Sequence, residues 1–412
     1  MADPSTCPPL TPASIAAAHA KIAPYIHRTP LLTSKTLDKI ASSPNPRAYL
    51  TDNPPIGSKN GDQSSNTVAT PRLRLHFKAE NQQRIGAFKA RGAFHALMRL
   101  NETMGLDELR RRGGVITHSS GNHAQALALA AHVFGVPSCI VMPGISTPSK
   151  ILGTKEYATE VVFSGSTSVE RVEKVKEMQA RSSGEGAVLV PPYDHPDIVL
   201  GQGTVGLEMG EQFVEGRGKD EEKKELDLVV APIGGGGLLG GIATWFSDKP
   251  TKVVGAEPSF QGADDARRGL VERKRIESVK SLTIADGLRT PVGVVNWGIV
   301  SDKEKLEAVY AVSEEEIKMA MRLVWERMKC VVEPSGCVAL ATVLFNEEFR
   351  KWIAEQQKEG EFWDVGVVFS GGNTTMKAVA ALFGEEKESI PEEREEGKVG
   401  KGGERVAENV AG

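Results

Sequence analysis

The sequence predicts an α/β protein built on mostly parallel β-sheets with helices on both faces. From Gly114 onward, short apolar segments of strand length alternate with segments of helical periodicity, a pattern typical of parallel strands joined by crossover helices. The strands are almost continuously apolar, as expected where both faces of a sheet are covered. Glycines and small polar residues follow several of these strands, and open α/β sheets bind ligands at such strand ends.

The N-terminal part supplies a helix and two strands before this alternation begins. Residues 12–23 have one apolar helical face and are followed by a proline, while residues 29–31 begin an extended segment. Residues 73–78 alternate between apolar and polar side chains, which predicts a half-buried strand. Residues 42–70 are rich in Ser, Pro, Asn, Gly and Asp, so we expect a disordered surface insertion there.

The remaining elements alternate along the chain. The expected strands are 114–117, 138–142, 160–163, 226–233, 252–257 and 364–369, and the expected helices are 87–100, 124–134, 201–215 and 238–246. A further helix begins at the capping box Ser313-Glu314-Glu315-Glu316, and its apolar face includes Ile317 and Met321. Beyond Phe383 the chain is rich in Glu, Lys and Gly, and we expect a disordered tail.

Composition narrows the function classes. Of the 412 residues, 25% are charged and 40% hydrophobic, and the net charge of -4 favours neither nucleic acid nor an anionic membrane as a partner. The four cysteines form no CxxC pair, which disfavours a zinc knuckle or a disulfide framework. The N-terminus lacks a basic segment followed by an apolar one, and no apolar run is long enough to span a membrane. We therefore expect a cytoplasmic protein.

Lys89 lies in the first turn of a predicted helix, after the strand at 73–78 and the turn residue Gly86. A lysine amine attacks a carbonyl carbon only when part of its population is neutral, which an apolar pocket brings about. A solvated surface charge is the alternative interpretation of this lysine taken alone. Motifs further along the chain favour the chemical role.

Four consecutive glycines, Gly234 to Gly237, separate a buried strand from a helix. Such a turn lets several backbone N–H groups point at one anion, and the helix N-terminus adds partial positive charge. We therefore predict a phosphate-binding turn, with a merely flexible loop as the alternative. Gly235, Gly237 and Gly240 also match G-x-G-x-x-G, and Glu257 follows about 20 residues later, so an NAD-dependent oxidoreductase stays open.

Two other strand ends carry small polar residues. The stretch His118-Ser119-Ser120-Gly121-Asn122-His123 offers hydroxyls, an amide and N–H groups that suit a carboxylate or a ring oxygen, and Ser370-Gly371-Gly372-Asn373 follows the last strand. Helix capping and an ordinary turn are the alternatives for these motifs taken singly. If the three strand ends share one crevice, they place a phosphate cradle and a candidate imine lysine together. Pyridoxal phosphate requires that combination.

Six motifs in this order resemble the fold-type II pyridoxal phosphate enzymes of the serine/threonine dehydratase and serine racemase family. They are GAFKARGA, THSSGNHAQAL, GQGT, PIGGGGLLGG, IADG and FSGGN, and they lie within residues 11–383. The resemblance implies two open, mostly parallel sheets with helices on both faces, of the tryptophan synthase β type. We expect a large domain at 12–113 and 195–383, which binds the cofactor, a small domain at 114–194, and the tail at 384–412.

The resemblance also implies roles for single residues. Lys89 would carry pyridoxal 5'-phosphate as an imine, Asn122 would bond its phenolic oxygen, and Ser370 would face its pyridine nitrogen. The implied cofactor-binding residues are Phe88, Lys89, Asn122, Gly234, Gly235, Gly236, Gly237, Leu238 and Ser370. The implied substrate carboxylate pocket is lined by Ser119, Ser120 and His123.

A serine hydroxyl at the pyridine nitrogen makes the ring a weaker electron sink than a carboxylate would, which favours loss of a β-substituent as the Cα proton leaves. We predict an ammonia-lyase that converts L-serine, L-threonine or 3-hydroxyaspartate to a 2-oxo acid and ammonia, with Lys89 as base. Serine racemase is the nearest alternative, because Ser120 matches the second acid or base of the racemases. Pro192-Tyr193-Asp194 resembles the dehydratases more. A non-catalytic binding protein is a further alternative, against which Lys89 argues.

A second cofactor is implied by resemblance to the racemase branch, in which a Glu, a backbone carbonyl and an Asp bind Mg²⁺ or Ca²⁺. The matching residues are Glu257, Ala263 and Asp265, although their spacing is two residues longer than the family's pattern. A solvated acidic loop is the alternative. The resemblance further implies a homodimer. Because 39 residues follow Asn373 (412 − 373), we expect no regulatory domain and no control by isoleucine.

Overall fold

Two β-sheets organise the chain. The computed structural model describes residues 3–51, 70–119, 121–165, 168–181, 186–217 and 225–384. The larger sheet has the strand order β1-β2-β10-β7-β8-β9 and is parallel except for β1, which is antiparallel to β2. Its strands are β1 Leu31–Thr33, β2 Leu73–Ala79, β7 Leu228–Pro232, β8 Lys252–Pro258, β9 Ala308–Val312 and β10 Trp363–Phe369.

The smaller sheet has the order β5-β4-β3-β6, and all its pairs are parallel. Its strands are β3 Val115–His118, β4 Ser138–Pro143, β5 Glu160–Ser164 and β6 Val188–Leu189. These strands all lie within 114–194, and the strands of the larger sheet all lie outside that range. The expected two-sheet fold is confirmed. The division into two domains stays a prediction, because the described residues up to Thr375 form one compact unit.

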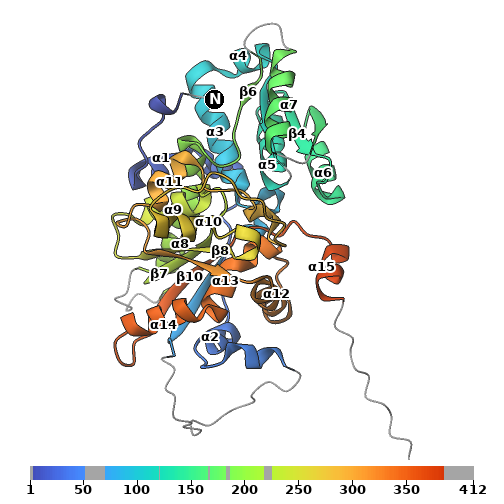
Figure 1. The fold of residues 1–412 in the computed structure, drawn as a ribbon. Helices are drawn as coiled ribbons and strands as arrows, with labels where there is room; N and C mark the ends of the chain where they lie inside the picture. The colour runs from blue at the N-terminus through green and yellow to red at the C-terminus, as the bar shows by residue number, and fades with distance from the viewer. Residues whose placement is uncertain are drawn as a thin grey trace, which may run out of the picture. The chain divides into compact units, whose positions relative to one another are not determined.

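Helices cover both sheets (Figure 1). In the larger sheet, α8 and α9 lie on one face while α2 and α13 lie on the other. The helices are α1 Pro12–Ile22, α2 Lys35–Ala41, α3 Lys89–Met104, α4 Leu106–Arg111, α5 Asn122–Val133, α6 Pro148–Lys155, α7 Ser168–Ala180, α8 Pro196–Glu215, α9 Gly237–Phe246, α10 Asp265–Glu272, α11 Val294–Val300, α12 Glu314–Leu323, α13 Pro334–Phe345, α14 Glu347–Gln356 and, in a second unit, α15 Met376–Phe383. Within the described ranges, every helix is too short or too polar to traverse a lipid bilayer.

The smaller sheet shows why its strands are apolar along their whole length. Successive side chains of a strand point to opposite faces, and here both faces are covered. Ile140 and Met142 join the core that includes α5, whereas Val141 packs with Val175 and Met178 of α7. A strand between two helical layers therefore has no solvent face.

Local sequence signals are confirmed near the N-terminus and in the C-terminal half of the chain. Ile15, Ala18 and Ile22 are the buried residues of α1. The Ser313 hydroxyl accepts from the Glu316 N–H, and the Glu316 carboxylate accepts from the Ser313 N–H, which completes the predicted capping box. Both signals need only neighbours in the sequence.

The predicted disordered insertion at 42–70 is wrong in its first part. Residues Pro46–Leu50 form a 3₁₀ helix, in which Arg47 pairs with Glu316 at 2.6 Å and lies over the ring of Phe345. These contacts attach residues that look like a linker in the sequence to α12 and α13. Residues 52–69 of the insertion and 385–412 of the tail lie outside the described residues.

The prediction that β2 is half-buried is also wrong at Lys78. This strand lies between β1 and β10, and the Lys78 ammonium is completely buried. It donates to Glu208 at 2.7 Å, to Gln212 at 2.8 Å and to the carbonyl of Thr29 at 2.7 Å. A polar position in the alternation thus faces a charged cluster inside the protein rather than solvent.

That cluster contains two cations and two anions. Arg91 forms paired hydrogen bonds with Glu80 (2.8 Å each) and with Glu208 (2.8 and 2.7 Å). Burial alone would raise the pKa of Glu208, but Arg91, His19 and Lys78 hold it well below its usual range. We call Lys78, Glu80, Arg91 and Glu208 the buried charge cluster. It joins β2, α3 and α8.

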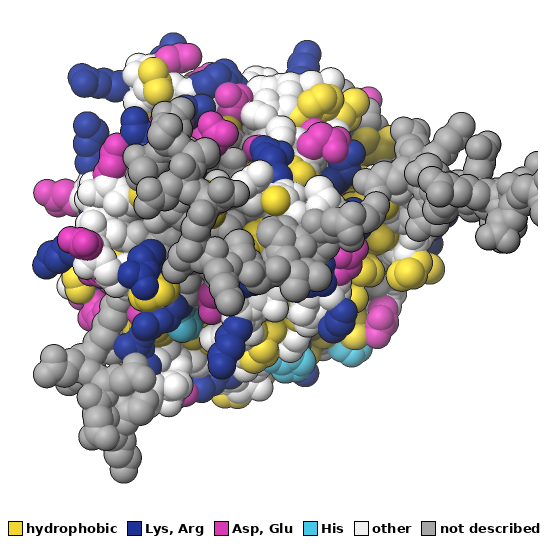
Figure 2. All heavy atoms as spheres, turned by 90° about the horizontal axis from the view of Figure 1, so that it is seen from below, with side chains coloured by type: hydrophobic (Ala, Val, Ile, Leu, Met, Phe, Trp, Pro, Cys, Tyr) yellow, Lys and Arg dark blue, Asp and Glu magenta, His cyan; other side chains and the backbone are white. Residues whose placement is uncertain are grey.

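The outer surface shown in Figure 2 carries Lys and Arg side chains interspersed with Asp and Glu. This mixture agrees with the small net charge of -4. A face of this kind has no one-signed field of the sort that attracts nucleic acid.

We predict that Glu208→Ala lowers the free energy of unfolding by about 3–5 kcal/mol, because it leaves two buried cations with one carboxylate. Urea unfolding measures the loss. The control is Arg267→Ala, which breaks the exposed pair with Glu348 and should cost at most about 1 kcal/mol. Equal losses in the two variants would contradict a special role for the buried charge cluster.

Candidate active site

Lys89 is the first residue of α3, and its amine donates to the carbonyl of Pro192 at 2.7 Å. The amine lies 5.0 Å from the centre of the Phe88 ring. Burial lowers the pKa of Lys89 to about 8. Part of the amine population is therefore neutral near neutral pH, which is the condition for a nucleophilic amine.

The tetraglycine turn lies between β7 and α9, as predicted. Gly236 has φ +92°, a left-handed conformation that favours glycine, and it precedes the first residue of α9. Among the described residues, no loop carbonyl or side chain accepts the N–H groups of Gly234 to Gly237. Several donors at a helix N-terminus are thus available to one anion.

Tyr193 connects the lysine to this turn. A Cβ at Gly235 would overlap the Tyr193 ring, and one at Gly237 would lie 3.1 Å from the Tyr193 carbonyl oxygen. Asn296 completes the contact by donating to the carbonyls of Gly235 (2.6 Å) and Tyr193 (3.2 Å). The Lys89 amine bonds to Pro192, and the adjacent Tyr193 packs against the tetraglycine turn. The amine and the anion cradle therefore both contact the dipeptide Pro192-Tyr193.

The third strand end meets the same region. The Phe88 N–H donates to the carbonyl of Ser370 at 3.1 Å, and Gly371 forms a β-bridge with Ala87. Ser370 is buried at the end of β10. The structure therefore brings Phe88, Lys89 and Ser370 together, although they lie on different elements.

Asn122 begins α5, and two other side chains hold its amide. Its Nδ2 donates to Glu333 at 2.7 Å, and its Oδ1 accepts from Asn373 at 2.9 Å. Asn373 belongs to the segment that follows Ser370. Asn122, which lies just after β3 of the smaller sheet, thus contacts the segment that follows β10 of the larger sheet.

Both histidines of this loop are neutral at neutral pH. His123 is buried and donates from Nε2 to the carbonyl of Val190 (3.3 Å), so Nδ1 carries the lone pair, and Nδ1 has no partner among the described residues. Burial, helped by the charge of Lys89, lowers the pKa of His123 to about 3. A carboxylate near His123 would therefore need the backbone N–H and not the ring. Burial likewise lowers the pKa of His118 to about 4.

The serines of the predicted carboxylate pocket are described only in part. The Ser119 hydroxyl accepts from the Gly121 N–H at 3.3 Å, so it already caps its own loop. Ser120 lies outside the described residues. The roles of both serines stay predictions.

Sequence reasoning missed a second group of charges beside this loop. The Lys150 amine lies 2.5 Å from the Asp286 carboxylate and 3.7 Å from Glu333, and its stem packs against Gly121. Burial raises the pKa of Glu333 to about 7. A signal existed for two of these residues: Asp286 belongs to the IADG motif, and Glu333 precedes a proline that opens an apolar helix.

The predicted metal ligands Glu257 and Asp265 are both buried. Each carboxylate accepts backbone N–H groups, Glu257 from Ala266 (3.1 Å) and Arg267 (2.7 Å), and Asp265 from Val292 (3.0 Å). Burial and nearby carboxylates raise the pKa of Glu257 well above its usual value, and burial raises the pKa of Asp265 to about 6. A Glu257 that caps α10 in this way is not placed to bond the ribose of a dinucleotide.

Cys7, His195 and Asp197 are the described side chains that lie close enough together to share one metal ion. The Asp197 N–H donates to His195 Nδ1 at 3.1 Å, so the proton of the neutral ring is on Nε2, which faces the Cys7 thiol at 3.9 Å. That nitrogen has no lone pair for a metal. The thiol instead donates to the Asp197 carboxylate at 3.4 Å.

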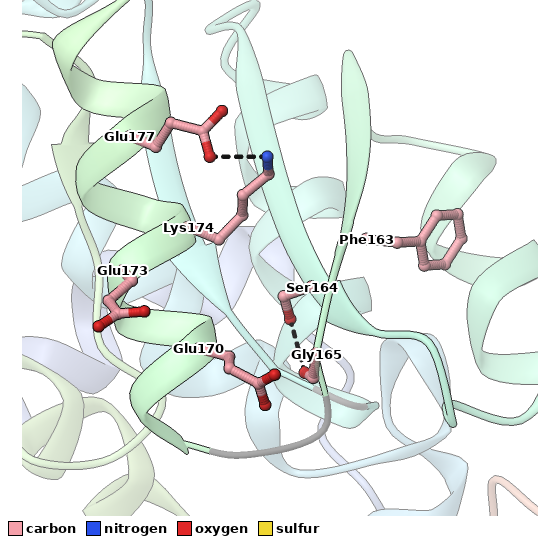
Figure 3. Close-up of a pocket in the computed structure, with 7 residues that line it drawn as sticks. All are labelled: Phe163, Ser164, Gly165, Glu170, Glu173, Lys174 and Glu177. Carbon is pink, nitrogen blue, oxygen red and sulfur yellow. Dashed lines mark hydrogen bonds and ion pairs between the residues drawn. The ribbon is translucent and has the colours of Figure 1, made fainter.

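A hollow of ≈490 Å³ lies elsewhere, along β5 and α7 (Figure 3). Figure 3 shows that its polar lining is mostly acidic, with Glu170, Glu173 and Glu177 beside a single cation, Lys174. It contains none of the predicted site residues and does not suit a phosphate. A smaller hollow of ≈280 Å³ adjoins the site at Ile85 and Asn373.

We predict that Lys89 reacts with an amine-acylating reagent from a pH about two units below that at which an ordinary lysine reacts, because the amine is neutral above its pKa of about 8. Mass spectrometry of the Lys89 peptide over a pH series gives the midpoint. Nα-acetyl-lysine in the same tube is the control. A midpoint above pH 10 would contradict a desolvated amine.

Comparison with known proteins agrees with this geometry. The family model described as "Pyridoxal-phosphate dependent enzyme" matches residues 63–371. The chain is 36% identical over 372 residues to a serine racemase of Arabidopsis thaliana (90% of this chain, 95% of that protein) and 35% identical over 362 residues to a beta-hydroxyaspartate dehydratase of Paracoccus denitrificans (87% and 95%). The structure of maize serine racemase superposes with a TM-score of 0.73 at 32% identity, covering 90% of this chain and 96% of that one. The chain belongs to the family of pyridoxal-phosphate dependent enzymes.

Proposed function

We propose that this enzyme eliminates water from a small 3-hydroxy amino acid and releases a 2-oxo acid and ammonia. The observation that carries the proposal is the partly neutral Lys89 amine, which is joined through Pro192 and Tyr193 to the tetraglycine turn. An amine and an anion cradle in one region suit a ligand that has an aldehyde at one end and a phosphate at the other. Relatives named for hydroxyaspartate support the choice of substrate class.

Bound pyridoxal phosphate supplies an aldehyde carbon that joins an amine and a ring that withdraws electrons from the substrate Cα. Lys89 would hold it covalently, the N–H groups of Gly234 to Gly237 with Leu238 would hold its phosphate, and Phe88 would pack near its ring. Asn122 would donate to the ring oxygen, and Ser370 would face the ring nitrogen. The free donors of the turn and the desolvated amine fit this group.

The protein's own groups then have separate tasks. The Lys89 amine would be a base of suitable pKa to accept the Cα proton of a bound substrate. The N–H groups of Asn122 and His123 at the start of α5 would bind the substrate carboxylate, because the Ser119 N–H already donates to the carbonyl of Val141 (3.0 Å) and the neutral ring of His123 cannot donate from Nδ1. A hydroxyl at Ser370 does not hold a full positive charge on the ring nitrogen, which favours elimination.

Serine racemisation is the second candidate, because several relatives that cover most of this chain are named serine racemase. It requires an acid or base on the face of Cα opposite Lys89, and Ser120 is our candidate for that role. Both reactions start with the same proton transfer to Lys89. On the resemblance alone we also propose a cytoplasmic homodimer, which sedimentation would identify by its doubled mass.

We predict that the purified enzyme releases a 2-oxo acid from at least one of L-serine, L-threonine and 3-hydroxyaspartate. Chiral analysis of recovered serine in the same tubes separates elimination from racemisation. Lys89→Ala should lose the cofactor's visible absorbance band and at least about 10³-fold in activity. Lys155→Ala, at an exposed lysine of α6, is the control. Full activity in Lys89→Ala would contradict the proposal.

We further propose that Glu257, the carbonyl of Ala263 and Asp265 hold Mg²⁺ or Ca²⁺. Oxygen ligands suit these ions, and a cation would offset the mutual repulsion of two buried carboxylates. After chelation, adding either ion at about 100 times its dissociation constant should raise the unfolding temperature by about 5 °C.

Asp265→Asn should abolish that rise, whereas Asp264→Asn should keep it, because Asp264 pairs with Arg268 instead. The measurement is thermal unfolding with and without each ion. An equal rise in Asp265→Asn and the wild type would exclude this site.

A further inference from the structure

Asn373 has no role in the proposed function so far, yet it is bonded to two parts of the site. Its Nδ2 donates to the carbonyl of Ile85 at 2.7 Å and to Asn122 Oδ1 at 2.9 Å. Both hydrogens of one amide nitrogen are thus used. One bond reaches the turn before Lys89, and the other reaches the start of α5.

These bonds can run in only one direction. A backbone carbonyl only accepts, so Asn373 must face Ile85 with its nitrogen. The second hydrogen of that nitrogen then points at Asn122, which must accept it with Oδ1. The amide of Asn122 is consequently turned so that its own nitrogen faces Glu333, whose carboxylate accepts at 2.7 Å.

The turn that Asn373 holds is unusual. Ile85 has φ 58°, a left-handed conformation that is rare for a β-branched residue, and Gly86 has φ 71°. A Cβ at Gly86 would lie 2.7 Å from Asn373 Oδ1, and the Gly86 carbonyl accepts from the Gly372 N–H at 2.9 Å. Backbone and side chain of the 372–373 segment therefore brace the turn that leads into Lys89.

Glu333 is equally confined on the other side of Asn122. A Cβ at Gly371 would lie 2.5 Å from Glu333 Oε1, so only glycine allows this approach. The Glu333 N–H donates to the Gly371 carbonyl at 3.0 Å, and the charged group nearest its second oxygen is Lys150, at 3.7 Å. The backbone of Gly371, next to Ser370, therefore lies against the Glu333 carboxylate and holds it beside Asn122.

We propose that Asn373 is a positioning residue that fixes the direction of the Asn122 amide, with Glu333 holding its opposite side, so that Asn122 offers its second Nδ2–H to the ring oxygen of pyridoxal phosphate. This inference rests on the proposed function. An inverted Asn122 would present an oxygen instead, and two oxygens would repel. Asn373 thus decides whether Asn122 is a donor to the cofactor.

Asn373→Ala tests this without adding charge. A donor stabilises the negative ring oxygen most after the neighbouring imine nitrogen has lost its proton, so losing the donor raises the pH midpoint of the cofactor's visible absorbance change. We expect a rise of about one pH unit and about tenfold weaker cofactor binding, as for one hydrogen bond. The matched control is Asn81→Ala, which loses a bond to the Val331 carbonyl beside Gly372 and should change neither.

A double-mutant cycle separates positioning from general loosening. In an Asn122→Ala background, Asn373→Ala should move the midpoint no further, because it acts through Asn122. If Asn373→Ala fails to fold, Asn373→Asp is the second variant, because it keeps the shape of the side chain. The effect of its added charge is measured in the Asn122→Ala background and subtracted.

An unchanged midpoint and affinity in folded Asn373 variants, an equal change in Asn81→Ala, or full additivity with Asn122→Ala would overturn the inference. In each of these cases the wild type still binds cofactor, so the proposed function stands. A wild type that takes up no cofactor would overturn the proposed function itself, and this inference with it.

Discussion

The buried charge cluster is the interaction on which the arrangement of the site depends. All four of its side chains are buried, and each forms an ion pair with an opposite charge of the cluster within 2.8 Å. A cluster of this kind contributes little net stability when complete but is costly to break. It therefore acts mainly by forbidding other packings of β2, α3 and α8.

Each of those three elements leads directly into the site. The strand β2 continues into the turn braced by Asn373, and Arg91 lies in the same first helical turn as Lys89. Helix α8 begins just after Pro192 and Tyr193, which contact the lysine and the tetraglycine turn. A shift of any one element would separate the amine from the anion cradle, and the buried charges oppose such a shift.

Close helix contacts complete the frame and account for the GQGT motif. A Cβ at Gly201 would lie 2.7 Å from Gly92 Cα, and a Cβ at Gly241 would lie 2.5 Å from the Gly203 nitrogen. Glycines thus let α8 approach α3 on one side and α9 on the other. The GQGT motif acts here through packing, and it places α9 with its N-terminal turn.

The sequence by itself determined the fold class, the order of most elements and the positions of Lys89, the tetraglycine turn and the strand-end loops. These features depend on periodicity, capping and glycine at strand ends, which neighbours in the chain decide. The buried helix α13 escaped this reasoning because it is apolar all round and has no amphipathic period.

Only the tertiary structure decided which polar residues are buried and which residues they bind. Lys78 looks like a solvent-facing position of an alternating strand, and the sequence around Glu333 does not identify the amide that it binds. Their partners lie 130 and 211 residues away in sequence. The pKa and the hydrogen bonds of a buried charged group depend on the groups that replace its hydration shell. The packing of the whole chain determines which groups these are.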